Sequence, residues 1–155
     1  MSDHILKIIP ADRRHVPPPE AHGPALSLLE QLAPGEAEVQ VSEKLLYIDA
    51  GEALEWIVCP RCRTRLNRYQ EPNAEWYAQV DEELSRSDVE SLTVKVPCCK
   101  ADVPFSELEL EDGGFARFEI AIWNPDVGEY QLPASSMTQL EEVLGCPLRQ
   151  VWAHY

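Results

Sequence analysis

The sequence predicts an α+β fold: a ferredoxin-like, split βαβ sheet with a zinc-ribbon-like insertion between its second and third strands. Three observations lead to this prediction. Residues 1–53 have the order strand, helix, strand, and residues 114–155 repeat that order, as the split βαβ fold requires. In the intervening residues 54–113, two strand-like segments each end at a cysteine pair. The length of 155 residues suits one domain carrying a small insert.

The first strand–helix–strand unit begins with His4–Ile9, whose sequence HILKII predicts a buried strand. After a proline-dense loop, Pro24 is expected in the first turn of a helix, where a missing N–H is tolerated. One alanine and three leucines follow at helical spacing, and a Pro-Gly pair ends the helix. The segment Val39–Ile48 predicts the second strand, with a bulge or turn at residues 42–44.

The insertion begins with alternating apolar residues that predict a short strand running into Cys59. Asn73 is expected to cap a helix that carries Tyr77 and Val80 on one side. The alternating segment 92–96 then predicts a second strand that leads to the next cysteine pair.

The second strand–helix–strand unit opens with Phe118, Ile120 and Ile122, which alternate with other residues as in a half-buried strand. A helix is expected after Pro133, with Ser136 and Gln139 at the spacing of a capping box, and Gly145 is expected to end it. The last strand is LRQVWAHY, at residues 148–155. The first and third strands of the body are the most apolar, so they are expected to be central.

Four cysteines have the arrangement of a metal site: Cys59, Cys62, Cys98 and Cys99. Cys59 and Cys62 form a C-x-x-C turn after a strand, which directs two sulfurs the same way, and Zn²⁺ takes four such ligands in a tetrahedron. The insertion at residues 54–113 is too short to hold a large core of its own, so a metal crosslink would stabilise it. Cys98 and Cys99 are adjacent, so both can bind the metal only at a sharp bend. The alternative is one cysteine ligand from this pair, with Asp102 or water completing the site.

Two other interpretations of the cysteines remain open. Cys-Pro-Arg-Cys also has the form of a thiol oxidoreductase motif, although the residues after it lack a helical apolar face. The thiols could also be buried and reduced without metal. Cys146 stands apart from the others and is expected to be a small buried apolar residue.

Charge is distributed unevenly along the chain. The formal net charge is −14, from 13 basic and 27 acidic residues. Four arginines lie in or just after the first cysteine turn: Arg61, Arg63, Arg65 and Arg68. Subtracting them leaves nine basic and 27 acidic residues elsewhere, a net charge of −18. The arginines either offset the thiolate charge of the metal site or contact a nucleic acid or an acidic partner.

Composition and motifs exclude several classes of function. So acidic a surface disfavours general nucleic-acid or membrane binding. No apolar run approaches the ~20 residues that cross a bilayer, and the start lacks the features of a signal peptide, so a cytoplasmic location is expected. No phosphate-binding loop, dinucleotide-binding fingerprint, nucleophile elbow or zinc-protease motif is present, so the sequence favours a non-enzymatic role without deciding the question.

Five short segments carry a resemblance to known proteins: the ILKIIP start, the CPRC turn, the PCC pair, the FARF segment and the LGCPLRQVWAHY ending. With these segments the sequence resembles a family of small, largely uncharacterised bacterial proteins that contain a zinc ribbon. The resemblance implies a zinc-bearing cytoplasmic protein and supplies no established activity.

We therefore expect a zinc-binding protein that acts through protein–protein interaction, as an immunity or accessory factor for a basic partner. A nucleic-acid-associated zinc ribbon using the four arginines, and a thiol oxidoreductase using the CPRC motif, are the alternatives.

Overall fold

A computed structural model describes residues 3–128 and 131–155 of the chain. Its largest sheet has four strands in the order β2-β8-β1-β9, and every neighbouring pair is antiparallel. The strands are β1 (His4–Pro10), β2 (Glu36–Ile48), β8 (Gly114–Trp123) and β9 (Leu148–His154). The prediction of a mixed α+β fold is thus confirmed, and β1 and β8, the most apolar strands, are the central ones.

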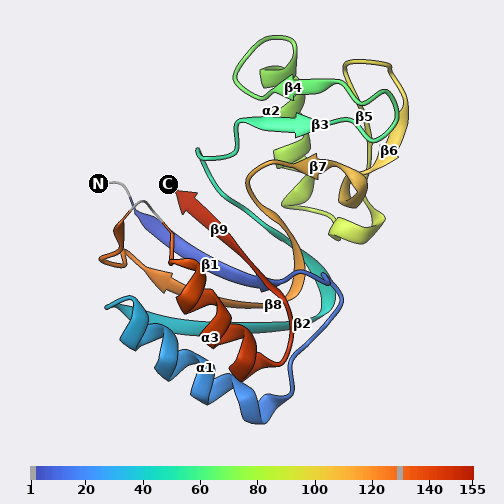
Figure 1. Ribbon diagram of the computed structural model, residues 1–155. Helices are drawn as coiled ribbons and strands as arrows, with labels where there is room; N and C mark the ends of the chain where they lie inside the picture. Colours follow the sequence, from blue (N-terminus) through green and yellow to red (C-terminus); the bar gives the residue numbers. More distant parts are fainter. Residues whose placement is uncertain (1–2, 129–130) are drawn as a thin grey trace.

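Two helices, α1 (Pro19–Leu32) and α3 (Ala134–Leu144), lie side by side on one face of this sheet (Figure 1). Alternation along the central strands directs Leu6, Ile8 and Ile120 toward the helices, which contribute Leu29 and Leu140 to the same buried cluster. The residues of this helix-side core are buried between the sheet and the two helices. They fix the register of the sheet, because a one-residue slip of a strand would expose its core side chains.

The helix termini differ from their predicted form. Helix α1 begins at Pro19, so Pro24 lies inside the helix rather than in its first turn. Residues Ser136 and Gln139 form no capping box, because the N-cap of α3 is Pro133 and no side chain caps the helix. Gly145 ends α3 as predicted, with φ of 76° in the left-handed region.

Strand β2 contains the predicted irregularity. Its pairing with β8 shifts between Val41, which faces Phe118, and Leu46, which faces Ala116. Four residues of β2 therefore stand opposite the single residue Arg117, whose Nε donates to the Ser42 carbonyl at 3.1 Å. This bulge turns the end of β2 toward the segment that follows.

The segment between β2 and β8 forms short elements gathered beyond one end of the sheet (Figure 1). They are β3 (Trp56–Val58), β4 (Arg65–Asn67), α2 (Asn73–Leu84), the 3₁₀ turn Val89–Ser91, β5 (Thr93–Lys95), β6 (Asp102–Pro104), the 3₁₀ turn Phe105–Glu107 and β7 (Glu109–Leu110). Asn73 does not cap α2, because the N-cap is Pro72 and the Asn73 amide instead donates to the Asn67 carbonyl.

The insert and the sheet share a hydrophobic core. One buried cluster joins Ile9 and Phe115 of the sheet to Ile57, Val94 and Phe105 of the insert. The Phe105 and Phe115 rings meet edge to face, with centroids 5.6 Å apart. The insert thus packs against the sheet face opposite the helices, so the two parts are expected to stabilise each other.

Within residues 3–128 and 131–155, none of the helices combines the length and apolar character needed to cross a membrane.

Candidate metal centre

Two β-hairpins of the insert carry the four cysteines. In the first hairpin β3 pairs with β4, and in the second β5 pairs with β6. The last paired residues are Val58 with Arg65 in one and Lys95 with Asp102 in the other, so each connection contains six residues. The cysteines therefore lie on two turns of equal length.

The two turns also have the same backbone hydrogen bonds. In the first, the Cys59 N–H donates to the Thr64 carbonyl at 3.0 Å, and the Arg63 N–H donates to the Cys59 carbonyl at 3.0 Å. In the second, the Val96 N–H donates to the Ala101 carbonyl at 3.0 Å, and the Lys100 N–H donates to the Val96 carbonyl at 3.1 Å.

A left-handed residue completes each turn at the same position. Arg63 has φ of 64° and Lys100 has φ of 63°. A non-glycine residue rarely adopts this conformation, so its occurrence at both equivalent positions supports a common turn geometry.

The equivalence of the turns explains the adjacent cysteines. It aligns Cys62 with Cys99, but it aligns Cys59 with Val96, which is fully buried. Cys98 occupies the position that Arg61 has in the first turn, one residue before the cysteine position that both turns share. The second turn thus lacks a cysteine at its first position and has one at its third.

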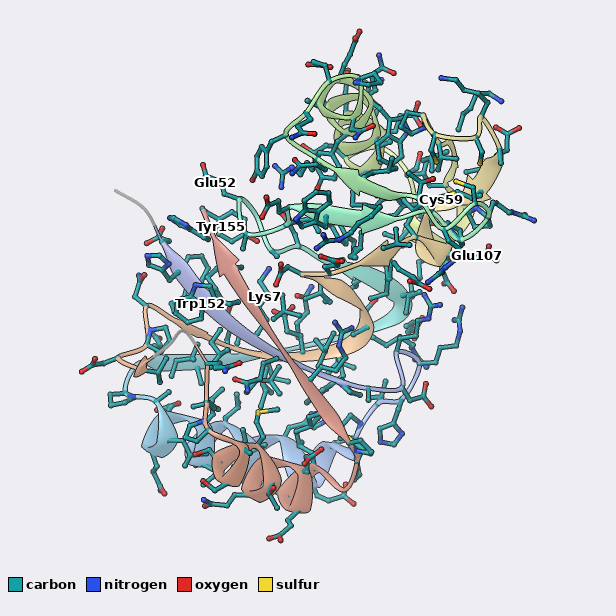
Figure 2. The ribbon with its side chains drawn as sticks, turned by 45° about the horizontal axis from the view of Figure 1, so that its top comes forward. Lys7, Glu52, Cys59, Glu107, Trp152 and Tyr155 are labelled. Carbon is teal, nitrogen blue, oxygen red and sulfur yellow. The ribbon has the colours of Figure 1, made fainter. Side chains whose placement is uncertain are left out.

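The turn geometry brings all four sulfurs together. Every pair lies within 4.8 Å; the Sγ atoms of Cys59 and Cys99 are 3.9 Å apart, and those of Cys62 and Cys98 are 3.4 Å apart. A tetrahedral zinc with Zn–S bonds of about 2.3 Å has S–S edges of about 3.8 Å. The four cysteines are therefore at metal-binding distance, and the sharp bend required of Cys98 and Cys99 is present. The first turn is labelled by Cys59 in Figure 2.

The surroundings of the sulfurs affect their ionisation differently. The hydroxyl and backbone of Thr64 lower the pKa of the Cys62 thiol to about 6 by hydrogen bonding. Burial, together with hydrogen bonding to the thiols of Cys62 and Cys59, raises the pKa of the Cys98 thiol to about 12. A dication bound between the sulfurs would favour the thiolate form of all four. The Arg61 N–H also approaches the Cys59 sulfur at 3.4 Å, as expected of a turn that stabilises negative charge on sulfur.

Asp102, the alternative ligand, does not join the cluster, and Cys146 lies apart from it. Asp102 lies in β6, where its Oδ1 is 3.2 Å from the Lys95 Nζ. Cys146 follows α3 and packs at the edge of the helix-side core. Cys146, predicted to be a small buried apolar residue, packs as an apolar residue but is only partly buried.

Two of the four arginines form ion pairs with strand β7 and the residue after it. Arg63 donates to both carboxylate oxygens of Glu109 at 2.7 and 3.0 Å, and Arg65 donates to both oxygens of Glu111 at 2.7 and 2.6 Å. The Arg65 guanidinium also lies 3.9 Å from the centre of the Trp56 ring. These contacts hold the pKa of Glu109 and of Glu111 below the ordinary value.

The other two arginines have different environments. Arg68 donates to the Gly51 carbonyl at 2.6 Å, and its guanidinium lies over the rings of Tyr69 and Tyr77. Within the described part of the chain, the Arg61 guanidinium alone among the four has no hydrogen bond, ion pair or ring contact. Three of the four arginines therefore make contacts within the chain itself.

The cluster has the ligand set of a structural metal site. Four protein ligands fill a tetrahedron and leave no position for substrate or water, unlike a catalytic zinc site. The oxidoreductase alternative requires its first cysteine at a helix N-terminus, whereas β4 follows the CPRC turn and α2 begins only at Asn73.

Comparison with known proteins returns no match: neither a family model, nor a curated protein, nor a solved structure is similar to this chain. The resemblance to small bacterial CPxC…PCC proteins therefore rests on the sequence motifs alone.

Proposed function

We propose that this chain is a non-enzymatic zinc-binding protein that acts through protein–protein interaction, as an accessory or immunity factor for a basic partner. Its zinc would be held by Cys59, Cys62, Cys98 and Cys99. The observation that carries the metal assignment is the convergence of four sulfurs within 4.8 Å on two equivalent turns. Thiolates in a tetrahedron favour zinc or iron, and the closed ligand set favours a structural role.

The proposed architecture is a ferredoxin-like body with a zinc-ribbon-like insert. The strand order β2-β8-β1-β9, with two helices on one face, supports the body. The two cysteine-bearing hairpins support the insert. Because the insert shares a core with the strand ends that it covers, zinc would stabilise those strand ends as well as the insert.

Charge supports a basic partner rather than a nucleic acid. The chain carries 27 acidic and 13 basic residues, and the arginines most suited to phosphate contact are largely occupied. Arg63 and Arg65 are each paired with a carboxylate, and Arg68 binds backbone carbonyls of its own chain. An acidic surface attracts basic proteins and repels phosphate backbones.

Affinity capture from the source cells, at low and high salt, tests the interaction. We expect a basic protein at one copy per chain, lost as salt screens the contact. A gel-shift assay at low salt is expected to show no nucleic-acid binding. Absence of a stoichiometric protein partner, or a shift abolished by neutralising the four arginines, would overturn this proposal.

A further inference from the structure

The sheet face opposite the helices is covered by the insert at one end only. Ile9 and Phe115 belong to the core shared with the insert, whereas Ile5, Ala121 and Ala153 form a small separate cluster. Beyond this cluster Trp123 is 43% exposed and Tyr155 is 42% exposed. This end of the sheet face therefore presents two large aromatic residues to solvent.

A small residue in the middle of this face creates a cavity. Ala121 of β8 is flanked across the sheet by Lys7 of β1 and Glu38 of β2. Along β8 its neighbours on the same face are Glu119 and Trp123, because side chains two residues apart point the same way. The larger side chains surround the alanine and leave a cavity of about 330 Å³.

The acidic side of the cavity combines carboxylates with an aromatic ring. The Trp123 Nε1–H donates to the Glu38 Oε1 at 3.1 Å, which fixes the ring and the carboxylate relative to each other. Glu119 lines the same cavity, and Lys7 is the basic side chain that acts on its carboxylate. Burial, opposed by Lys7 and reinforced by Glu38, raises the pKa of Glu119.

Lys7 lines the side of the cavity opposite Glu38, where hydrogen bonds hold its ammonium group. Lys7 is 9% exposed, and its Nζ donates to the Asp49 carbonyl at 2.6 Å and to the Tyr155 hydroxyl at 2.9 Å. Figure 2 shows Lys7 on β1 and Tyr155 just past the end of the neighbouring strand β9. Lys7 and Glu38 lie on opposite sides of Ala121, two strand spacings or about 10 Å apart. Lys7 therefore acts electrostatically on Glu119, whereas Glu38, on the far side of Ala121, receives its hydrogen bond from the Trp123 indole rather than from a cation.

We propose that this cavity binds an arginine side chain of the basic partner protein. This inference rests on the proposed function and names the surface that would perform it. A guanidinium can donate two parallel hydrogen bonds to a carboxylate and stack on an indole ring, and the pairing of Glu38 with Trp123 offers both contacts. A second cavity of about 310 Å³, lined by Glu36, Ala37, Glu38 and Trp123, continues from this point and gives room for flanking residues.

A nuclear magnetic resonance titration with N-acetyl-arginine amide tests the proposal without requiring the partner. The indole N–H signal of Trp123, assigned with Trp123→Phe, is followed among the four tryptophans. We expect a saturable shift of this signal with the arginine probe and none with N-acetyl-citrulline amide, which has the same shape without the charge. The Trp152 signal, from the sheet face toward the helices, is the internal reference.

Matched variants separate specific binding from general attraction to an acidic protein. Glu38→Gln is expected to weaken binding of the arginine probe about two- to fivefold, as for a partly exposed ion pair. Glu30→Gln removes the same charge from an exposed position on helix α1, away from the cavity, and is expected to leave binding unchanged.

An unmoved Trp123 signal, or equal effects of Glu38→Gln and Glu30→Gln, would overturn the cavity proposal. In that case arginine-induced shifts confined to another acidic surface would leave a basic partner possible. Metal content is measured on the same samples, so a failure of the zinc assignment is recognised separately.

Discussion

Replacing Val96 with cysteine is expected to restore the metal affinity that is lost when Cys98 becomes alanine. The two cysteine turns have the same hydrogen bonds, and Val96 stands where Cys59 stands in the first turn. A sulfur at position 96 should therefore point to the metal as the Cys59 sulfur does. The double variant Val96→Cys/Cys98→Ala would convert the second turn into a regular C-x-x-C turn.

The magnitude follows from the number of ligands. Structural zinc sites bind with roughly 10–16 kcal/mol, so one thiolate of four contributes about 2.5–4 kcal/mol. Cys98→Ala alone should accordingly weaken binding ~10²–10³-fold. Val96 is fully buried, so shortening it costs about 1 kcal/mol of packing. The double variant should recover all but about fivefold of the affinity.

Competition with a chromophoric chelator measures the affinity of each variant for zinc. Val94→Cys/Cys98→Ala is the matched control, because Val94 is also buried in β5 but lies before the turn. Equal affinities for Val96→Cys/Cys98→Ala, Val94→Cys/Cys98→Ala and Cys98→Ala would refute the equivalence of the two turns.

Three further predictions concern stability. Chelation of the metal should increase hydrogen exchange throughout the insert and in the strand ends that it covers, while the helix-side core stays protected; uniform exchange would contradict this division. Glu119→Gln should stabilise the protein at pH 7, because a raised pKa means that the buried carboxylate is ionised at a cost. This gain in stability should disappear below about pH 4.5, because Glu119 is then protonated in both the folded and the unfolded state. Urea unfolding of both proteins at pH 7 and below pH 4.5 measures the difference. Phe105→Ala should destabilise the protein by about 3–5 kcal/mol, because Phe105 is fully buried between sheet and insert. Val41→Ala is the control: its side chain is 50% exposed, so the free energy of unfolding should change by less than about 0.5 kcal/mol in the same assay.

The longer strands were predictable because each carries enough apolar residues to show its period. Strand β8 alternates over ten residues, and β1 is nearly continuous in its apolar character. By contrast, β4 has three residues and β7 has two, so one buried side chain or none marks each of them. Pairing with β3 creates these strands, and such pairing is not a local property of the sequence.

The helix starts were less predictable than the helix ends. Gly145 has a backbone conformation that few other residues adopt, so its position marks the end of α3. At the start of α1, Pro19 and Pro24 both suit a first helical turn, and the helix begins at Pro19. Ser136 and Asn73 have capping side chains but lie inside their helices.

The cysteine ligands were visible in the sequence, but their equivalence was not. The turn that carries Cys98 and Cys99 repeats the first turn in its backbone hydrogen bonds. The adjacent cysteines do not show this repeat in the sequence. The partners of the arginines were also hidden, because Arg63 and Arg65 pair with glutamates 46 residues further along the chain. Only the folded insert brings Glu109 and Glu111 beside them.

Native mass spectrometry with elemental analysis tests the central claim most directly. The purified chain is predicted to hold one zinc ion. After Cys59, Cys62, Cys98 or Cys99 is individually replaced by serine, a competing chelator should remove the ion at a concentration that leaves it on the unchanged chain. Cys146→Ser, which removes a cysteine outside the cluster, should retain it. A chain without zinc, a chain that holds iron instead, or Cys98→Ser that keeps its zinc against the chelator as well as the unchanged chain does would contradict the four-cysteine zinc site.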